Sequence, residues 1–182
     1  MRHNNIDDMP TLLTATPNGM TKTLPEMIYR VEVFCRPGFS DPAGAALLAQ
    51  LPMIGIQSVT EIKVGALYDF RGRFTLGQMM TVAKELLTDP ITQDFVLNGQ
   101  RPVGAIWSPH WRIEVRLKNS VTDPVESSLR KAVEDLGLPA PESARTGVVY
   151  KFWGRLYPAQ AERVAVKLLA NPVVHRYSVE SC

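Results

Sequence analysis

The sequence is poor in cysteine and has no long apolar run. Its 182 residues include only Cys35 and Cys182. Two cysteines are too few for a disulfide framework, and they form no Cys-x-x-Cys or Cys/His cluster of the kind that binds zinc. No apolar run approaches the ~20 residues that span a bilayer, and residues 1–23, which contain Asp7 and Asp8, have no apolar stretch typical of a secretory signal. We therefore predict a cytoplasmic protein with reduced thiols and no membrane partner.

An excess of charge and the common catalytic motifs are also missing. The net charge is +2, from 20 basic and 18 acidic residues, which is too balanced to favour nucleic acid as a partner. No phosphate-binding glycine motif and no G-x-S-x-G nucleophile motif occurs. The three histidines, His3, His110 and His175, are scattered along the chain. These absences predict neither a catalytic residue nor a metal site nor a cofactor on this chain.

An internal repeat dominates what the sequence does contain. A shift of 82 residues superposes residues 29–100 on residues 111–182 without a gap, with 18 identities in 72 positions. About one position in sixteen would match by chance, and two copies are too few for a solenoid, so we infer a duplicated domain. We predict a tail over residues 1–25, a first repeat over 26–99, a linker over 100–109 and a second repeat over 110–182.

Each repeat has the same pattern of expected elements. Alternating apolar and polar residues predict a first strand around residues 29–35 and 111–117. The pairs Asp41-Pro42 and Asp123-Pro124 then favour a helix start, because Asp suits an N-cap and Pro the first helical turn. Glu126 completes a capping box in the second repeat.

The ends of these helices can be predicted as well. We expect the helix of the second repeat to run over residues 124–136, with Gly137 as its left-handed stop, and Pro52 to end its counterpart early. Residues 59–64 and 67–74 predict two strands joined at Gly65. A second helix, stopped by Pro90 or Pro172, and a short last strand complete each repeat.

The resulting order predicts the fold class. A β-α-β-β-α-β unit is the ferredoxin-like plan, so we expect an α+β protein with two tandem ferredoxin-like units. One face of each four-stranded sheet has no helices. Two units in one chain can cover that face or pair their exposed edges, and we expect an intramolecular pseudo-dimer.

Three short motifs stand out: the D-P-x-G of residues 41–44, the R-x-G of residues 145–147 and the L-L-A-N-P-V-V of residues 168–174. Together they resemble the PurS family, the small subunit of phosphoribosylformylglycinamidine (FGAM) synthase. The resemblance covers each repeat from end to end, so the chain looks like a tandem PurS. It departs from the family where Ala66 and Val148 replace a lysine and where Glu126 replaces the glycine of D-P-x-G.

The resemblance implies a non-catalytic bridge in a ligase complex. In the family, PurS holds a glutaminase (PurQ-type) subunit against an ATP-dependent synthetase (PurL-type) subunit, and ammonia from glutamine passes between them. ATP, Mg and glutamine are then expected on the partner subunits. Further self-association of the pseudo-dimer is left open.

Repeated cations are the candidate partner-binding residues. Tyr68, two residues before Phe70, leads to Arg73, and Tyr150 leads to Arg155 in the same way. Two arginines at equivalent positions can contact a partner, a carboxylate or a phosphate. The alternative is that the aromatic side chains belong to the core and the arginines to a solvated surface.

Two further cations stand next to glycines. Lys63 precedes Gly65, and Arg145 precedes Gly147, so each pair can present a cation beside a tight turn. The alternative is a turn with a solvent-facing base. We expect Asp41, Pro42, Gly65, Asp123, Pro124 and Gly147 to be structural.

The two repeats differ in charge. Residues 29–100 carry 6 basic and 7 acidic side chains, and residues 111–182 carry 11 and 8. Either each repeat has specialised for a different neighbour or the surface charges have drifted.

Three other functions compete with the bridge. A tandem RNA-binding module shares the strand order, but its third strand should read close to K/R-G-F/Y-G/A-F-V-x-F/Y, which residues 67–74 and 148–156 do not match. A regulatory domain pair would bind a small molecule between the repeats. A small enzyme would need a polar constellation that the sequence does not supply.

Overall fold

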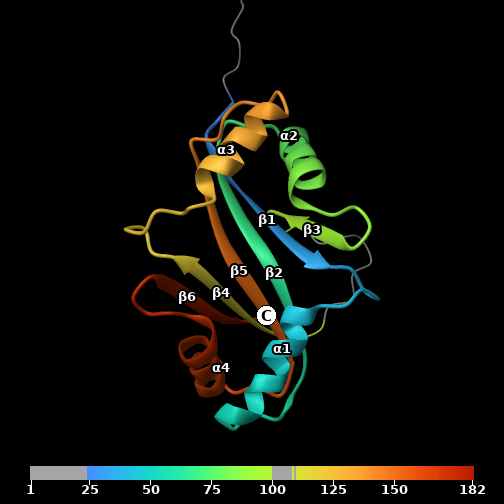
Figure 1. Cartoon of the computed structure of the whole chain (residues 1–182), viewed down its shortest axis with the longest axis vertical. Helices are drawn as coiled ribbons and strands as arrows, with labels where there is room; N and C mark the ends of the chain where they lie inside the picture. The colour runs from blue at the N-terminus through green and yellow to red at the C-terminus, as the bar shows by residue number, and fades with distance from the viewer. Residues whose placement is uncertain (1–23, 100–107, 109) are drawn as a thin grey trace, which may run out of the picture.

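Each repeat contributes three strands to the structure. The computed structural model describes residues 24–99, 108 and 110–182. The tail predicted over 1–25 and the linker predicted over 100–109 lie almost entirely outside the described residues, so these domain boundaries stay predictions. The first repeat contains β1 (Met27–Cys35), α1 (Pro42–Gln50), β2 (Val59–Gly72), α2 (Leu76–Thr81) and β3 (Gln93–Leu97), and the second contains β4 (Trp111–Leu117), α3 (Glu126–Asp135), β5 (Ser143–Gly154), α4 (Pro158–Val164) and β6 (His175–Ser181) (Figure 1).

All six strands form one antiparallel sheet in the order β3-β1-β2-β5-β4-β6. The long central strands β2 and β5 join the two repeats. Ala66 lies opposite Val148, and these two residues are equivalent in the repeat, so the pairing is centred on a pseudo-twofold axis. The repeats thus pair their edges in an intramolecular pseudo-dimer, and the prediction of two tandem α+β units is confirmed.

The strand count predicted for each repeat was wrong. Residues 59–64 and 67–74 do not form two strands joined at Gly65, because β2 runs unbroken through that glycine. β5 likewise runs through Gly147, so each repeat is β-α-β-α-β. The reason is pairing, since β2 bonds to β1 along its second half and to β5 along nearly its whole length. Each glycine makes room for a neighbouring side chain and forms no turn.

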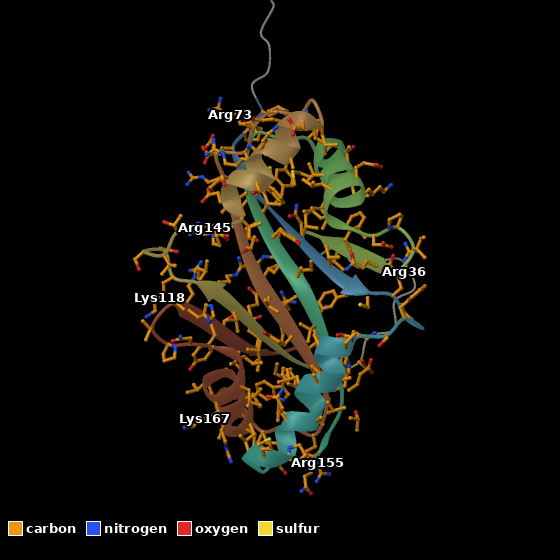
Figure 2. All side chains as sticks on the ribbon, in the orientation of Figure 1. Arg36, Arg73, Lys118, Arg145, Arg155 and Lys167 are labelled. Carbon is orange, nitrogen blue, oxygen red and sulfur yellow. The ribbon has the colours of Figure 1, made fainter. Side chains whose placement is uncertain are left out.

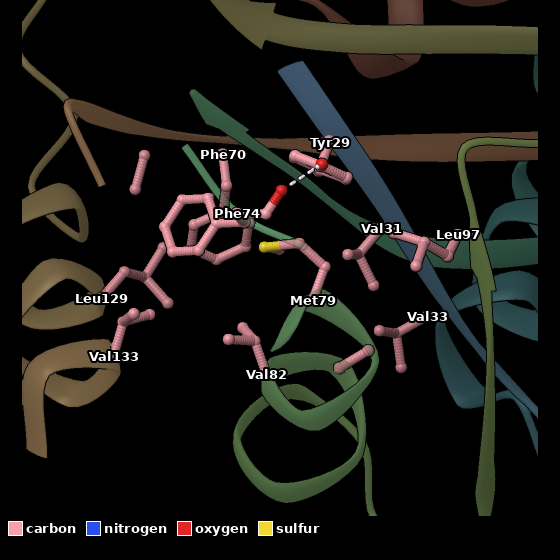
Figure 3. Close-up of a cluster of buried hydrophobic side chains, with 12 residues drawn as sticks. Tyr29, Val31, Val33, Phe70, Phe74, Met79, Val82, Leu97, Leu129 and Val133 are labelled. Carbon is pink, nitrogen blue, oxygen red and sulfur yellow. Dashed lines mark hydrogen bonds between the residues drawn. The ribbon is translucent and has the colours of Figure 1, made fainter. Parts of the chain in front are cut away.

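The hydrophobic cores are shared between the repeats. One core combines α2 of the first repeat with Leu129 and Val133 of α3 in the second (Figure 3). In this core the Tyr29 hydroxyl donates to the Phe74 carbonyl at 2.5 Å. The other core combines Leu47 of α1 with α4. Figure 1 shows α2 with α3 at one end of the sheet and α1 with α4 at the other. Burial of apolar surface therefore holds the two repeats together as one body.

The Asp-Pro pair stands before the first helix in each repeat, but the aspartate acts differently in the two repeats. In the first repeat Asp41 is the N-cap of α1, accepting from Gly44 N at 2.8 Å, and its other oxygen accepts from Val64 N of β2 at 2.8 Å. Asp123 instead accepts from Thr146 N of β5 at 2.6 Å and from Val125 N at 3.0 Å. Both aspartates fasten a helix to a central strand.

The predicted start of α3 at Pro124 was therefore wrong by two residues. Helix α3 begins at Glu126, whose carboxylate accepts from Ala144 N at 3.3 Å and forms no capping box. In the first repeat, a side chain at the equivalent position would meet a backbone, because a Cβ on Gly44 would lie 2.3 Å from the Ile62 carbonyl oxygen. The predicted left-handed stop at Gly137 is confirmed by its φ of 74°.

The second helix of each repeat ends as a π-helix. α2 continues over Val82–Leu87 and α4 over Ala165–Leu169. Pro90 and Pro172 follow three residues later, in agreement with the predicted stops. Pro52 lies in a 3₁₀ turn (Leu51–Ile54) that ends α1 early, also as predicted.

Candidate partner-binding surfaces

The predicted arginines Arg73 and Arg155 lie at opposite ends of the molecule (Figure 2). Both are exposed, and each follows the end of a central strand, β2 or β5. Arg155 is held by its backbone, since its N–H donates to the Ser58 carbonyl at 2.9 Å. The preceding Gly154 has φ of 111°, and a Cβ there would lie 2.4 Å from the same carbonyl oxygen, so only glycine permits this turn. The fold thus places these two equivalent cations at opposite ends.

The predicted cations Lys63 and Arg145 do not join the arginines. Lys63 Nζ lies 5.8 Å from the ring centroid of Trp153 and 3.7 Å from Glu61. Arg145 donates to the Val121 carbonyl at 3.2 Å. The expected tight turns beside them are absent from these described strands, because the glycines lie in extended backbone. Each cation is therefore a strand side chain with its own local partner.

Tyr68 and Tyr150 lie on the helix side of the sheet. Their rings are half-buried, and each packs against one of the two hydrophobic cores. Burial raises the pKa of both phenols. The geometry favours the interpretation that these tyrosines belong to the core, which leaves the arginines as the exposed part of the repeated motif.

The sequence analysis missed a set of paired charges on the helix-free face of the sheet. We call this set the inter-repeat ion network. It spans both repeats and consists of Arg30, Glu32, Asp69, Arg112, Glu114, Arg116 and Lys151. The signal that could have revealed it is the Arg-x-Glu pair that each repeat carries in its first strand.

Glu114 is at the centre of the network. It accepts from Arg112 at 2.5 Å, from Arg30 at 3.2 Å and twice from Arg116 at 3.1 Å. Burial opposes its ionisation, but Arg112, with help from the other two arginines, holds the pKa of the Glu114 carboxyl below its usual value of 4.5. Only 8% of Glu114 is exposed, so these are ion pairs with little water around them.

The second carboxylate, Glu32, completes the link between repeats. It is 5% exposed and accepts from two nitrogens of Arg112 at 2.7 and 3.1 Å. This fork is charge-assisted and bidentate, which is the strongest geometry for such a pair. Burial opposes protonation of Arg112, yet Glu32 and Glu114 raise the pKa of its guanidinium. Each repeat thus supplies an arginine to a glutamate of the other.

The contacts within the network also show that the sheet is curved. β1 and β4 are separated by β2 and β5, so contacts between their side chains require the sheet to curl toward its helix-free face. A groove of about 670 Å³ lies over the network, with Ile28 and Val96 on one side and Glu180 on the other. Since the charges beneath this groove bind one another, they are arranged for structure more than for chemistry.

No ready-made metal site or spanning helix is found within the described ranges. Across residues 24–99, 108 and 110–182, no three His, Cys, Asp or Glu residues come together as metal ligands. No helix in this part of the chain is long and apolar enough to cross a membrane.

The fold and the paired edges define a class, the duplicated α+β proteins in which two repeats share one sheet. The PurS family model, described as phosphoribosylformylglycinamidine (FGAM) synthase, matches residues 28–100 and again residues 110–181. The chain therefore belongs to the PurS family, a subunit of FGAM synthase in purine biosynthesis, and the resemblance seen in the sequence is confirmed.

Solved PurS structures match about one repeat each. The chain is 24% identical to Methanocaldococcus jannaschii PurS, with 41% of this chain and 96% of that one covered and a TM-score of 0.34. It is 26% identical to Thermus thermophilus PurS, over 40% of this chain and 94% of that one, with a TM-score of 0.32. No curated protein matches the chain.

Proposed function

We propose that the chain is a non-catalytic bridging subunit of FGAM synthase, which joins a PurQ-type glutaminase to a PurL-type synthetase. The observation that carries this proposal is the placement of Arg73 and Arg155. Equivalent, exposed cations at opposite ends of one rigid body allow two neighbours to be held at once (Figure 2). The match of the FGAM synthase family model to both repeats supports the proposal.

The chemistry belongs to the partners in this proposal. The glutaminase releases ammonia from glutamine and leaves glutamate. The synthetase activates the amide oxygen of formylglycinamide ribonucleotide with ATP, and ammonia displaces it to give the amidine, ADP and phosphate. ATP, Mg and glutamine then bind to the partner subunits, and the assembled complex works in the cytoplasm. The contribution of this chain is to fix the two partners so that ammonia passes between them.

Reconstitution tests the bridge directly. The glutaminase and synthetase subunits of the same organism would be mixed with and without this chain, and amidine formation would be followed with either glutamine or ammonium as the nitrogen donor. We expect the chain to be required for the glutamine-dependent rate and to leave the ammonium-dependent rate nearly unchanged. Equal glutamine-dependent rates with and without the chain would contradict the proposal.

The structure supports neither of the two main alternative functions, RNA binding and small-molecule binding. An RNA-recognition sheet needs exposed aromatic rings on its helix-free face, where this chain has the inter-repeat ion network. In the groove, charged groups such as Arg112 and Glu32 already bind each other, so a small molecule would compete with these ion pairs. A filter-binding salt series and a thermal-shift ligand screen are the respective checks.

A further inference from the structure

Two contacts on the helix-free face of the sheet are related by the pseudo-twofold axis but differ in chemistry. On one side Asp69 of the first repeat accepts from Arg116 of the second at 2.5 Å. On the other side Lys151 lies over the ring of Phe34, with its Nζ 4.2 Å from the ring centroid. Position 69 is equivalent to 151, and position 34 to 116. One structural position therefore carries an ion pair in one half and a cation–π contact in the other.

Both contacts lie over a glycine of a central strand. A Cβ on Gly65 would lie 2.5 Å from the ring of Phe34, and a Cβ on Gly147 would lie 3.0 Å from Cγ of Arg116. These glycines are themselves equivalent in the repeat. The ring of Phe34 and the aliphatic part of the Arg116 side chain thus occupy equivalent places, each over a glycine. The two contacts are therefore sterically interchangeable.

The register predicts what would follow if the second repeat paired with a copy of itself. Lys151 would then face Arg116 in place of Phe34. It would also stand opposite Arg145 on both sides of the axis, whereas in the actual pairing Lys151 stands opposite Lys63 on one side and Asp69 stands opposite Arg145 on the other. Three positive charges would meet on each side of the axis. Like charges on neighbouring side chains that are partly shielded from water repel one another and so oppose association.

The first repeat has the opposite property. Paired with itself, it would place Asp69 opposite Lys63 and Arg71 opposite Glu61, since these positions are related by the same register. Both cross-strand pairs are of opposite charge. The central strand of the first repeat is therefore self-complementary, whereas that of the second repeat is not.

We propose that the second repeat pairs only with the first, and that the Asp69–Arg116 and Lys151–Phe34 contacts enforce this choice. Because the second repeat has an excess of positive charge, it then needs a partner with acidic residues at the facing positions. A consequence is that the two ends of the pseudo-dimer are permanently different, which a symmetric pair of identical subunits does not allow. This inference concerns the interface between the repeats and does not depend on the proposed function.

Three full-length variants test the proposal. An exchange variant (Phe34→Arg, Asp69→Lys, Arg116→Phe, Lys151→Asp) swaps the two contacts between sides and keeps composition and net charge. A second-repeat-like variant (Phe34→Arg, Asp69→Lys) places lysine against arginine on both sides. A first-repeat-like variant (Arg116→Phe, Lys151→Asp) places aspartate against phenylalanine on both sides. Thermal unfolding would be measured at 0.05 M and 1 M NaCl.

We expect the exchange variant to unfold within about 3 °C of the unmodified chain, and the second-repeat-like variant to unfold roughly 10 °C earlier. High salt should recover much of that loss, because the Debye length falls to about 3 Å at 1 M. The first-repeat-like variant should lose less than the second-repeat-like one. The proposal is overturned if the exchange variant unfolds as early as the second-repeat-like variant, or if the latter shows no salt-dependent recovery.

Discussion

Glu114 shows how a single residue holds two repeats together. Its carboxylate is nearly buried and receives hydrogen bonds from Arg30 of the first repeat and from Arg112 and Arg116 of its own. Such a carboxylate adds less than its Coulomb attraction suggests, because Glu114, Arg112 and Arg116 all lose most of their hydration. Removing it alone is a different matter, since Arg30, Arg112 and Arg116 would then share only the carboxylates of Glu32 and Asp69.

We therefore predict that Glu114→Gln lowers the free energy of unfolding by about 3 kcal/mol. The substitution keeps the shape of the side chain and removes only its charge. Thermal and urea unfolding measured at pH 7 would give the change. Asp135→Asn, which removes the exposed Lys131–Asp135 pair of α3, is the control and should leave the midpoint unchanged. Equal effects of the two substitutions would show that the network is no more important than a surface ion pair.

The same carboxylate predicts an acid-sensitive stability. Because the pKa of Glu114 is lower in the folded chain than its usual value of 4.5, its contribution is complete above that pH and is lost as the pH falls through the folded pKa. Asp123 acts in the same direction, since hydrogen bonds from Thr146 outweigh its burial and lower its pKa below 3.8. The midpoint temperature should fall steeply below about pH 4.5.

The Glu114→Gln variant separates this effect from general acid denaturation. Its midpoint should depend less on pH than that of the unmodified chain between about pH 5 and pH 3, because it no longer has the shifted group. Parallel pH profiles for the two proteins would contradict the assignment to Glu114.

Some of these residue-level features could be predicted from sequence and others could not. The sequence predicts a helix cap at both Asp-Pro pairs, and Asp41 does cap α1 whereas Asp123 does not cap α3. The ion network was missed because strand alternation tells which face a residue occupies but not that the sheet curls until Arg30 meets Glu114. That contact depends on the pairing of two repeats 82 residues apart, which local patterns do not encode.

At the scale of elements, helix α1 is positioned by the absence of a side chain. Gly44 lies so close to β2 that a Cβ would stand 2.3 Å from the Ile62 carbonyl oxygen, a backbone atom that cannot move without disturbing the strand. Gly77 in α2 has no such neighbour, since the nearest atom to its Cβ would be Thr75 Oγ1 at 3.9 Å. Gly44 therefore allows a helix to approach a strand closely, whereas no such steric requirement applies to Gly77.

We predict opposite effects of alanine at these two glycines. Gly44→Ala should lower the free energy of unfolding by about 2 kcal/mol, because the helix must move away from the strand. Gly77→Ala should raise it by about 0.5–1 kcal/mol, because alanine is the better helix former. Urea unfolding of both variants measures the two changes under identical conditions. If Gly44→Ala were also stabilising, the close approach of α1 to β2 would have to be wrong.

Glycine explains the error in the predicted strands as well. In a sequence, Gly65 between two apolar runs is typical of a turn. In the structure, it permits the ring of Phe34 to lie against an unbroken strand. Local patterns do not distinguish a glycine that turns the chain from one that lets a neighbour approach, because the difference lies in a residue 31 positions away.

At the scale of the whole molecule, neither repeat has a core of its own. Leu129 and Val133 of the second repeat complete the core around α2, and Leu47 and Ile62 of the first complete the core around α4. We predict one cooperative unfolding transition for the chain, with equal calorimetric and van't Hoff enthalpies. Leu129→Ala should shift this whole transition downward. Two resolved transitions in scanning calorimetry would mean that the repeats unfold independently.

The last prediction concerns the ends of the molecule and depends on the proposed bridge. Arg73 and Arg155 are exposed, so Arg73→Glu and Arg155→Glu should leave the midpoint of thermal unfolding unchanged. If each end holds a different partner, each reversal should weaken binding of one subunit at least about tenfold and spare the other. Binding of the separate glutaminase and synthetase to immobilised chain would show this division. Lys167→Glu reverses an exposed charge at the same end of the molecule as Arg155 (Figure 2), and it is the control for the overall charge of that end. Loss of both partners from one reversal would place the two contacts on the same end and contradict a bridge built along the long axis.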